Sequence, residues 1–354
     1  MNWKSFGRSG LKVTELCLGT MTLAGQADDQ TSYAILDAAW EGGIRFIDTA
    51  DCYPIPIEIT TVGRTESLLG RWIKERRNRD QLVIATKAYF PVGPLPVHRG
   101  NSRLHLRRAC EASLRRLGVE QIDLYFCHGW DATVPLEETL SVLEDLRREG
   151  KIHYSGISNV RVPEVTAALL EAQRIGVSGF AGLQPRYNLL FRDLEESLFP
   201  LARSQGLGIM VYNPLAGGLL TGKHRVDAPP AEGTRFTLGT SGDIYRARYW
   251  KDPLLREATS LADLAKRSGL SLVTAAVAWT LGNSDVNSAI IGVSRPEQLA
   301  DQLKATTVTL PAPLKEALDH AWFRLPRTPV EGDPRVGNFY NVLESDGRPL
   351  YRSG

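Results

Sequence analysis

Residues 82–87 read Leu-Val-Ile-Ala-Thr-Lys, four apolar residues in succession followed by threonine and lysine. A strand with one face in water alternates apolar and polar residues, whereas a strand of a parallel sheet is buried on both faces and reads as a continuous apolar run. Residues 209–211, Ile-Met-Val, show the same pattern much later in the chain. Both runs therefore predict strands inside a parallel sheet.

Outward from residues 82–87, strand-like runs alternate with segments of helical apolar spacing in both directions. The expected strands are Glu15–Met21, Ile44–Asp48, Leu82–Lys87, Ile122–His128, His153–Asn159, Phe180–Gln184, Gly208–Asn213 and Ala289–Val293. The expected helices are Thr31–Trp40, Glu66–Arg76, Arg103–Leu117, Leu136–Arg148, Val162–Arg174, Leu194–Ser204, Pro253–Lys266, Leu272–Leu281 and Pro296–Leu303. Such unbroken alternation is typical of a parallel sheet covered by helices.

About eight strand–helix units favour a closed (β/α)8 TIM barrel of the α/β class over an open doubly wound sheet. An open dinucleotide-binding sheet would also carry G-x-G-x-x-G after its first strand, and no such motif follows residues 15–21. The chain has 354 residues, of which 43% are hydrophobic, so it can fill the core of such a barrel. We expect one barrel domain over residues 1–354, with the barrel itself at about 12–325.

Three segments fall outside the repeat. Met1–Val13 contains the turn Gly7-Arg8-Ser9-Gly10 and predicts a hairpin that caps the barrel floor. The connection Pro214–Lys251, after the seventh strand, is far longer than usual, and such loops are functional or disordered. Residues 326–354 are irregular, and we expect a tail that lies over the barrel mouth or is partly disordered.

The composition excludes several classes of partner. The 42 basic and 40 acidic residues give a net charge of only +2, too weak a field for nucleic acid. The longest apolar runs are too short to enter a membrane as a spanning helix, and the N-terminus does not resemble a signal peptide. Four cysteines without C-x-x-C spacing are typical of a reduced, cytoplasmic protein. The oligomeric state stays open, and no metal site is expected.

Ionisable side chains gather where three successive strands end. Asp48 ends the second expected strand, with Tyr53 five residues later, while Lys87 and His128 end the third and fourth. In barrels of this kind the chemistry lies at the strand ends, so these residues share one rim. Each of them alone is commonly structural: a cap, a packed ring, a surface charge or a buried histidine. Their convergence favours a catalytic interpretation.

Physical chemistry supplies a role for this set. A phenol has a pKa of about 10, and a nearby ammonium lowers it, so we expect Lys87 to make Tyr53 a better acid. Asp48 would hold Lys87 in place, and His128 would donate a hydrogen bond to a carbonyl oxygen. Such a set protonates an alkoxide but supplies no hydride, which implies a cofactor.

The same residues resemble the catalytic tetrad of the aldo-keto reductase superfamily. Four local strings strengthen the resemblance: Leu18-Gly19-Thr20-Met21, Phe46-Ile47-Asp48-Thr49-Ala50, Gly156-Ile157-Ser158-Asn159 and Ile291-Gly292-Val293-Ser294. It extends over about residues 10–325 and is strongest to the branch of bacterial aldo-keto reductases and potassium-channel β-subunits. The resemblance implies reversible reduction of aldehydes or ketones by NAD(P)H, with Tyr53 as the general acid.

The resemblance also implies where the cofactor lies. Ser158, Asn159 and Gln184 would hold the nicotinamide carboxamide, and Tyr212 would stack on the ring. Further cofactor contacts are expected from Thr20, Met21, Asp48, Asn213, Pro214, Leu215, Gly217, Lys223, Arg235, Gly292, Ser294, Arg295, Gln298, Asp301 and Gln302. Helix N-termini bind anions, so Ser294 and Arg295 would meet a 2′-phosphate, which favours NADP(H) over NAD(H).

Some positions depart from the family pattern. Asp301-Gln302 stands where an acid followed by asparagine commonly contacts the adenine. Trp130, after Gly129, either lines the substrate pocket or packs beneath a loop. Cys52 and Cys127 flank the tetrad residues and are interpreted as small buried residues, not as nucleophiles.

Two other functions are compatible with a barrel. The chain could serve as a regulatory or interaction subunit that senses NADPH, because channel β-subunits resemble it. A Schiff-base lyase could use Lys87, since aldolases also place a lysine at a barrel strand end. The lyase explains neither Tyr53 nor the nicotinamide-type residues, and a reductase of small carbonyl compounds explains both.

Overall fold

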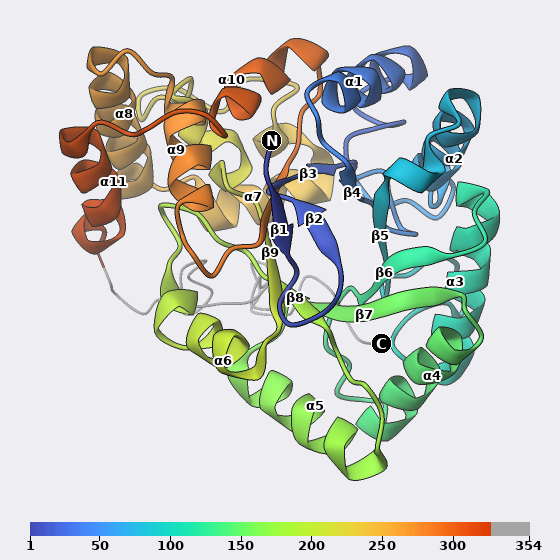
Figure 1. Ribbon diagram of the computed structural model, residues 1–354. Helices are drawn as coiled ribbons and strands as arrows, with labels where there is room; N and C mark the ends of the chain where they lie inside the picture. Colours follow the sequence, from blue (N-terminus) through green and yellow to red (C-terminus); the bar gives the residue numbers. More distant parts are fainter. Residues whose placement is uncertain (327–354) are drawn as a thin grey trace.

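The structure, a computed structural model, describes residues 1–326 and contains a closed barrel of eight parallel strands surrounded by helices (Figure 1). Neighbouring strands follow the order β10-β3-β4-β5-β6-β7-β8-β9, and β10 closes the barrel against β3 with Ile290 opposite Cys17. The predicted (β/α)8 barrel and its N-terminal hairpin are therefore confirmed. Residues 327–354, which include nearly all of the expected tail, lie outside the described part of the chain.

The barrel strands are β3 (Leu16–Gly19), β4 (Phe46–Asp48), β5 (Val83–Ala88), β6 (Ile122–Cys127), β7 (Ile152–Ser158), β8 (Gly182–Gln184), β9 (Gly208–Tyr212) and β10 (Ser288–Ile291). The helices are α1 (Asp29–Glu41), α2 (Arg64–Arg76), α3 (Arg103–Leu117), α4 (Leu136–Arg148), α5 (Val162–Ile175), α6 (Leu198–Gln205), α7 (Gly239–Tyr249), α8 (Asp252–Arg267), α9 (Leu272–Leu281), α10 (Leu299–Lys304) and α11 (Ala312–Arg324).

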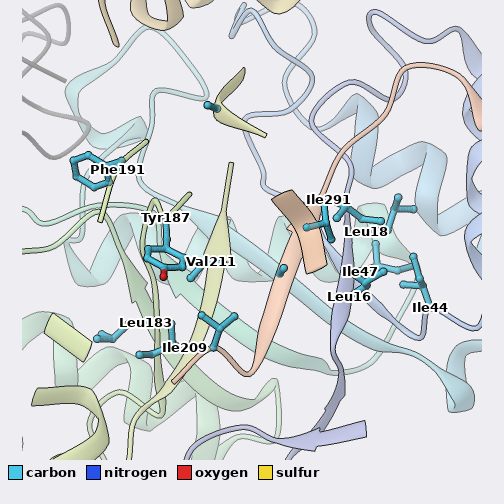
Figure 2. Packing of buried hydrophobic residues seen from close by; sticks show 14 of the residues in the cluster. Leu16, Leu18, Ile44, Ile47, Leu183, Tyr187, Phe191, Ile209, Val211 and Ile291 are labelled. Atoms are coloured by element: carbon cyan, nitrogen blue, oxygen red, sulfur yellow. The ribbon is translucent and has the colours of Figure 1, made fainter. Parts of the chain in front are cut away.

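Strand side chains alternate between two apolar layers. Leu16 and Leu18 face outward into the layer beneath the helices, and Cys17 between them faces the barrel interior. The same alternation holds on β9, where Val211 points outward and Met210 inward. Figure 2 shows side chains of this layer in two groups, one with Ile209 and Val211 and the other with Leu16 and Leu18. Burial on both faces explains the continuous apolar runs in the sequence.

The hairpin of β1 (Trp3–Ser5) and β2 (Lys12–Thr14) closes the barrel floor. Phe6 in its turn is fully buried and belongs to the interior cluster. A Cβ atom on Gly182 would lie 2.3 Å from the Phe6 ring, and one on Gly208 would lie 2.6 Å from it. A side chain at either position would displace this ring, so glycine at both positions leaves room for Phe6 in the barrel floor.

The helices differ from the expectations in three places. The helix expected over Leu194–Ser204 begins only at Leu198, after a short 3-10 turn over Asp193–Glu196. Pro200 has no N–H to donate to the carbonyl of Glu196, so the helix cannot continue back through that turn. The long connection after β9 contains α7 and two 3-10 turns, at 216–221 and 235–237. The last helix, α11, was not expected at all. Within residues 1–326 no helix is long and apolar enough to cross a membrane.

Candidate active site

Three adjacent strands bring the expected ionisable residues to one end of the barrel. In the register of β4 and β5, Asp48 lies opposite Ala85, and Lys87 lies two residues beyond it. His128 follows the last residue of β6, Cys127. Parallel strands present their carboxyl ends at the same rim, so side chains from all three strands converge there.

Lys87 and Asp48 form a buried ion pair. The Lys87 Nζ donates to Oδ2 of Asp48 at 2.6 Å and to the carbonyl oxygen of Thr49 at 2.7 Å, and the lysine side chain is 0% exposed. The other Asp48 oxygen, Oδ1, accepts from Nε2 of Gln184 at 2.8 Å. Burial raises the pKa of Asp48, and the neighbouring Lys87 charge and Gln184 amide partly offset this rise. The pair is therefore held rigidly by directed hydrogen bonds.

Tyr53 lies on the loop after β4, and its ring centroid is 5.1 Å from the Lys87 Nζ. Burial raises the pKa of the Tyr53 phenol well above its usual value, and the negative charge of Asp48 raises it further. The positive charge of Arg235 offsets this rise only in part, so the net shift is opposite to the lowering expected from a nearby ammonium.

The ring of His128 lies between two aromatic rings. Its centroid is 5.9 Å from that of Tyr53 and 4.8 Å from that of Phe90, both in edge-to-face geometry. The Asn159 side-chain amide donates to the His128 carbonyl oxygen at 2.9 Å. Burial lowers the pKa of His128 well below its usual value, and the Lys87 charge lowers it further. At neutral pH the imidazole is therefore uncharged and has a single N–H to donate.

A cavity of about 440 Å³ opens over these residues. Asp48, Tyr53 and His128 line it, whereas Lys87 is fully buried behind Asp48. Its walls include every residue that the sequence assigned to the cofactor: Thr20, Met21, Asp48, Ser158, Asn159, Gln184, Tyr212, Asn213, Pro214, Leu215, Gly217, Lys223, Arg235, Gly292, Ser294, Arg295, Gln298, Asp301 and Gln302. The volume falls in the range of about 300–1,000 Å³ usual for ligand sites.

Near the ion pair, the cavity wall retains unused hydrogen-bonding capacity. The Ser158 hydroxyl donates to the Gln184 carbonyl at 2.7 Å, which leaves its oxygen free to accept. Asn159 accepts from the Tyr212 hydroxyl at 2.8 Å and keeps one amide hydrogen, since a primary amide has two. Gln184 likewise keeps one N–H. These donors and acceptors suit a planar carboxamide, and the Tyr212 ring stands beside them.

Another part of the cavity lining, the cationic end, contains the positively charged residues Lys223 and Arg295. Burial lowers the pKa of Lys223, and the positive charge of Arg295 lowers it further, so the two cations are close enough to repel. Backbone N–H of Ser294 donates to the Gln298 side chain at 2.9 Å. An anion at this end would relieve the repulsion between the two cations.

Two polar atoms of the lining residues lack a protein partner. They are Nη1 of Arg235 and Oε1 of Gln302, and both are buried. Buried polar atoms normally have hydrogen-bond partners. These two atoms are therefore available to a ligand. With the donors and acceptors near the ion pair and the cationic end, the cavity fits a nicotinamide dinucleotide.

The aldo/keto reductase family model matches residues 15–322, which covers the whole barrel and every residue of the site described above. The chain belongs to the aldo/keto reductase family. Members of this family are oxidoreductases that generally use NAD(P)H and act on small carbonyl compounds.

Relatives within the aldo/keto reductase family include proteins of several kinds. The uncharacterized oxidoreductase YrpG of Bacillus subtilis is 36% identical, over 88% of this chain and 92% of its own length. A probable voltage-gated potassium channel subunit beta of Arabidopsis thaliana is 34% identical, over 87% of this chain and 92% of its own length. The L-glyceraldehyde 3-phosphate reductase of Escherichia coli K12 is 33% identical, over 86% of this chain and 87% of its own length.

Sequence reasoning missed part of this aldo/keto reductase cavity. Tyr245 of α7 lines it, and Gln26 donates from Nε2 to the Gly233 carbonyl at 2.7 Å, which joins the loop after β3 to the long connection. Neither residue belongs to a periodic or recognisable pattern. Trp130 is half-buried, packs against the outer apolar layer, and is not in the cavity lining within residues 1–326.

Proposed function

We propose that this protein is an NADP(H)-dependent reductase of aldehydes or ketones, reversible toward alcohol oxidation, with Tyr53 as the general acid. One observation carries the proposal. Tyr53, His128 and Asp48 line the same cavity, and Lys87 is buried behind Asp48, to which it is paired. Bound there, a reduced nicotinamide would supply the hydride that amino-acid side chains cannot provide.

Each residue of the tetrad has a distinct role in this proposal. Neutral His128 donates a hydrogen bond to the substrate carbonyl and orients it. The raised pKa of Tyr53 keeps its proton in place at neutral pH, ready for transfer to the far more basic alkoxide oxygen. The ammonium of Lys87, 5.1 Å from the ring, then stabilises the phenolate that remains. Asp48 keeps that ammonium in position.

Tyr53→Phe tests the general acid. We expect the turnover number with an aldehyde and NADPH to fall by about 10²- to 10⁴-fold, the usual contribution of a positioned acid. NADPH binding, measured by the quenching of protein fluorescence, should be unchanged because the aromatic ring of residue 53 remains. Turnover at the wild-type rate would show that another group supplies the proton.

The preference for NADP(H) is supported by the cationic end of the cavity. A 2′-phosphate near Lys223 and Arg295 would form charge-assisted hydrogen bonds, which are worth about twice as much as neutral ones. Arg295→Ala should weaken NADPH binding by about 10- to 100-fold and NADH binding far less. The control is Arg256→Ala, which removes an exposed arginine of α8. Equal losses for NADPH and NADH in Arg295→Ala would contradict the assignment.

A regulatory subunit that senses NADPH is the second candidate. The similarity to potassium channel β-subunits, at 34% identity, favours it as much as the similarity to reductases favours an enzyme. A panel of carbonyl compounds, beginning with short aldehydes because one relative is named for such a substrate, separates the two. Tight NADPH binding without turnover of any member would favour the sensor.

The lyase is disfavoured by the environment of Lys87. Its ammonium donates to Asp48 and to the Thr49 carbonyl and is shielded from the cavity. A Schiff-base lysine must lose its proton and reach the substrate carbon.

A further inference from the structure

The imidazole of His128 has a neighbour that the tetrad does not include. The Sγ atom of Cys52 lies 3.9 Å from Nδ1 of His128, within hydrogen-bond range for sulfur. Cys52 is 0% exposed and belongs to a small apolar cluster with Ala50, Tyr53 and Phe90. This is the one side-chain hydrogen bond found at a His128 ring nitrogen within residues 1–326.

The location of the imidazole proton decides what His128 can do. A neutral imidazole carries its proton on either Nδ1 or Nε2, and the nitrogen without it is an acceptor. Nδ1 faces the buried thiol and His128 lines the cavity, so Nε2 is the ring nitrogen left to meet a ligand there. Only the Nε2–H form donates to a carbonyl oxygen there, whereas the Nδ1–H form presents a lone pair and repels it.

The chemistry of the pair favours the Nε2–H form. Burial raises the pKa of the Cys52 thiol, and the negative charge of Asp51 raises it further, so the sulfur keeps its hydrogen. An S–H group is a weak donor, but an imidazole nitrogen is a strong acceptor. In the reverse arrangement a strong N–H donor would face sulfur, which is a weak acceptor.

Other neighbours of His128 do not select a ring nitrogen. The Tyr53 and Phe90 rings approach it edge-to-face and fix its plane. Asn159 binds its backbone carbonyl oxygen, not its ring. The charge of Lys87 acts on the whole imidazole by favouring its neutral state.

We propose that Cys52 is a positioning residue, whose S–H donates to Nδ1 of His128 and thereby keeps the imidazole proton on Nε2 for the substrate carbonyl. The catalytic consequence rests on the proposed reductase function. The tautomer itself does not, because it is a property of the protein without substrate.

The test measures the tautomer directly. Protein labelled with ¹⁵N only in histidine reports, through the chemical shifts and proton couplings of each ring, which nitrogen carries the hydrogen. The chain has 6 histidines, and His128→Gln assigns the relevant signals by their loss. The wild-type protein should show the Nε2–H form of His128.

Three variants of Cys52 separate hydrogen bonding from packing. Cys52→Ala and Cys52→Val remove the donor, and valine keeps most of the volume in case alanine fails to fold. Both should shift His128 toward a mixture of tautomers. Cys52→Ser restores a donor and should restore the Nε2–H form. The matched control is Cys127→Ala, which empties space at another fully buried cysteine beside His128 in the sequence, and it should leave the tautomer unchanged.

The kinetic expectation follows from the same shift. Loss of one neutral hydrogen bond changes the ratio of the two tautomers by about two- to tenfold. Because kcat/KM follows the fraction of His128 in the Nε2–H form, kcat/KM of Cys52→Val should fall by up to about twofold as the tautomers approach equal populations, and it should recover in Cys52→Ser. A wild-type His128 protonated on Nδ1, or an unaltered Nε2–H form in Cys52→Val, would overturn the proposal. A correct tautomer without carbonyl turnover would leave it intact and count against the reductase instead.

Discussion

Lys87→Met tests how much the buried ion pair contributes to the stability of the folded protein. Methionine fills a similar volume but removes the ammonium, so the Asp48 carboxylate keeps only the Gln184 amide as a side-chain donor. Breaking a buried pair by removing one partner costs about 3–5 kcal/mol when the remaining charge stays buried. The side chains of Lys87 and Asp48 are 0% and 4% exposed, so little of this cost is relieved by water.

The loss should depend on pH. Burial raises the pKa of Asp48 even beside Lys87, and without the ammonium it rises further. The folded variant then binds a proton more tightly than the unfolded chain, so its stability decreases as pH rises. Above the unfolded value of about 4, the deficit grows by about 1.4 kcal/mol per pH unit until it reaches its limit.

Thermal unfolding at pH 5 and pH 8 measures this effect. At about 2 °C per kcal/mol, the midpoint should fall by roughly 8 °C at pH 8 and by roughly 3 °C at pH 5. The double variant Asp48→Asn, Lys87→Met carries no charge at either position, so the difference between its midpoint and that of wild type should be nearly the same at both pH values. An equal loss at both pH values in Lys87→Met, or no improvement in the double variant, would refute the reasoning.

Two further predictions concern the floor and the mouth of the barrel. Gly182→Ala places a Cβ 2.3 Å from the Phe6 ring and 2.7 Å from the Gly208 carbonyl oxygen. The free energy of unfolding, measured by thermal melting, should therefore fall by about 1–3 kcal/mol. The control Gly10→Ala should be tolerated, because the nearest atom to its Cβ would be 3.4 Å away. An unchanged melting midpoint in Gly182→Ala would mean that the Phe6 ring can move aside without loss of stability. Gln26→Ala removes the hydrogen bond to Gly233 across the mouth and should speed NADPH release by about twofold in stopped-flow fluorescence; an identical release rate would show that this bond does not retain the cofactor.

The barrel could be predicted because each strand is buried on both faces, which leaves a clear apolar signal in runs such as residues 82–85. The convergence of Asp48, Tyr53, Lys87 and His128 could be predicted because strand ends share a rim, which turns positions in the sequence into neighbours in space. The helix α7 escaped prediction because it begins at a glycine within a segment rich in polar and small residues.

The pKa of Tyr53 could not be predicted from the sequence. Lys87 is close to the phenol, as expected, but the direction of the shift depends on how completely the loop buries the ring and on the charge of Asp48. Likewise, the contact between Cys52 and Nδ1 of His128 depends on a loop conformation that no local pattern specifies.

The site is divided along the chain. Asp48, Tyr53, Lys87 and His128 all come from β4 to β6 and the residues that directly follow them, whereas the cationic end of the cavity is built after β9 and β10. Under the proposed function, proton chemistry and coenzyme choice are thus encoded in separate stretches of sequence. A chimaera with another family member, joined within α4, would inherit its acid from one parent and its coenzyme preference from the other. Exchange of either half is therefore a direct route to new combinations of the two properties.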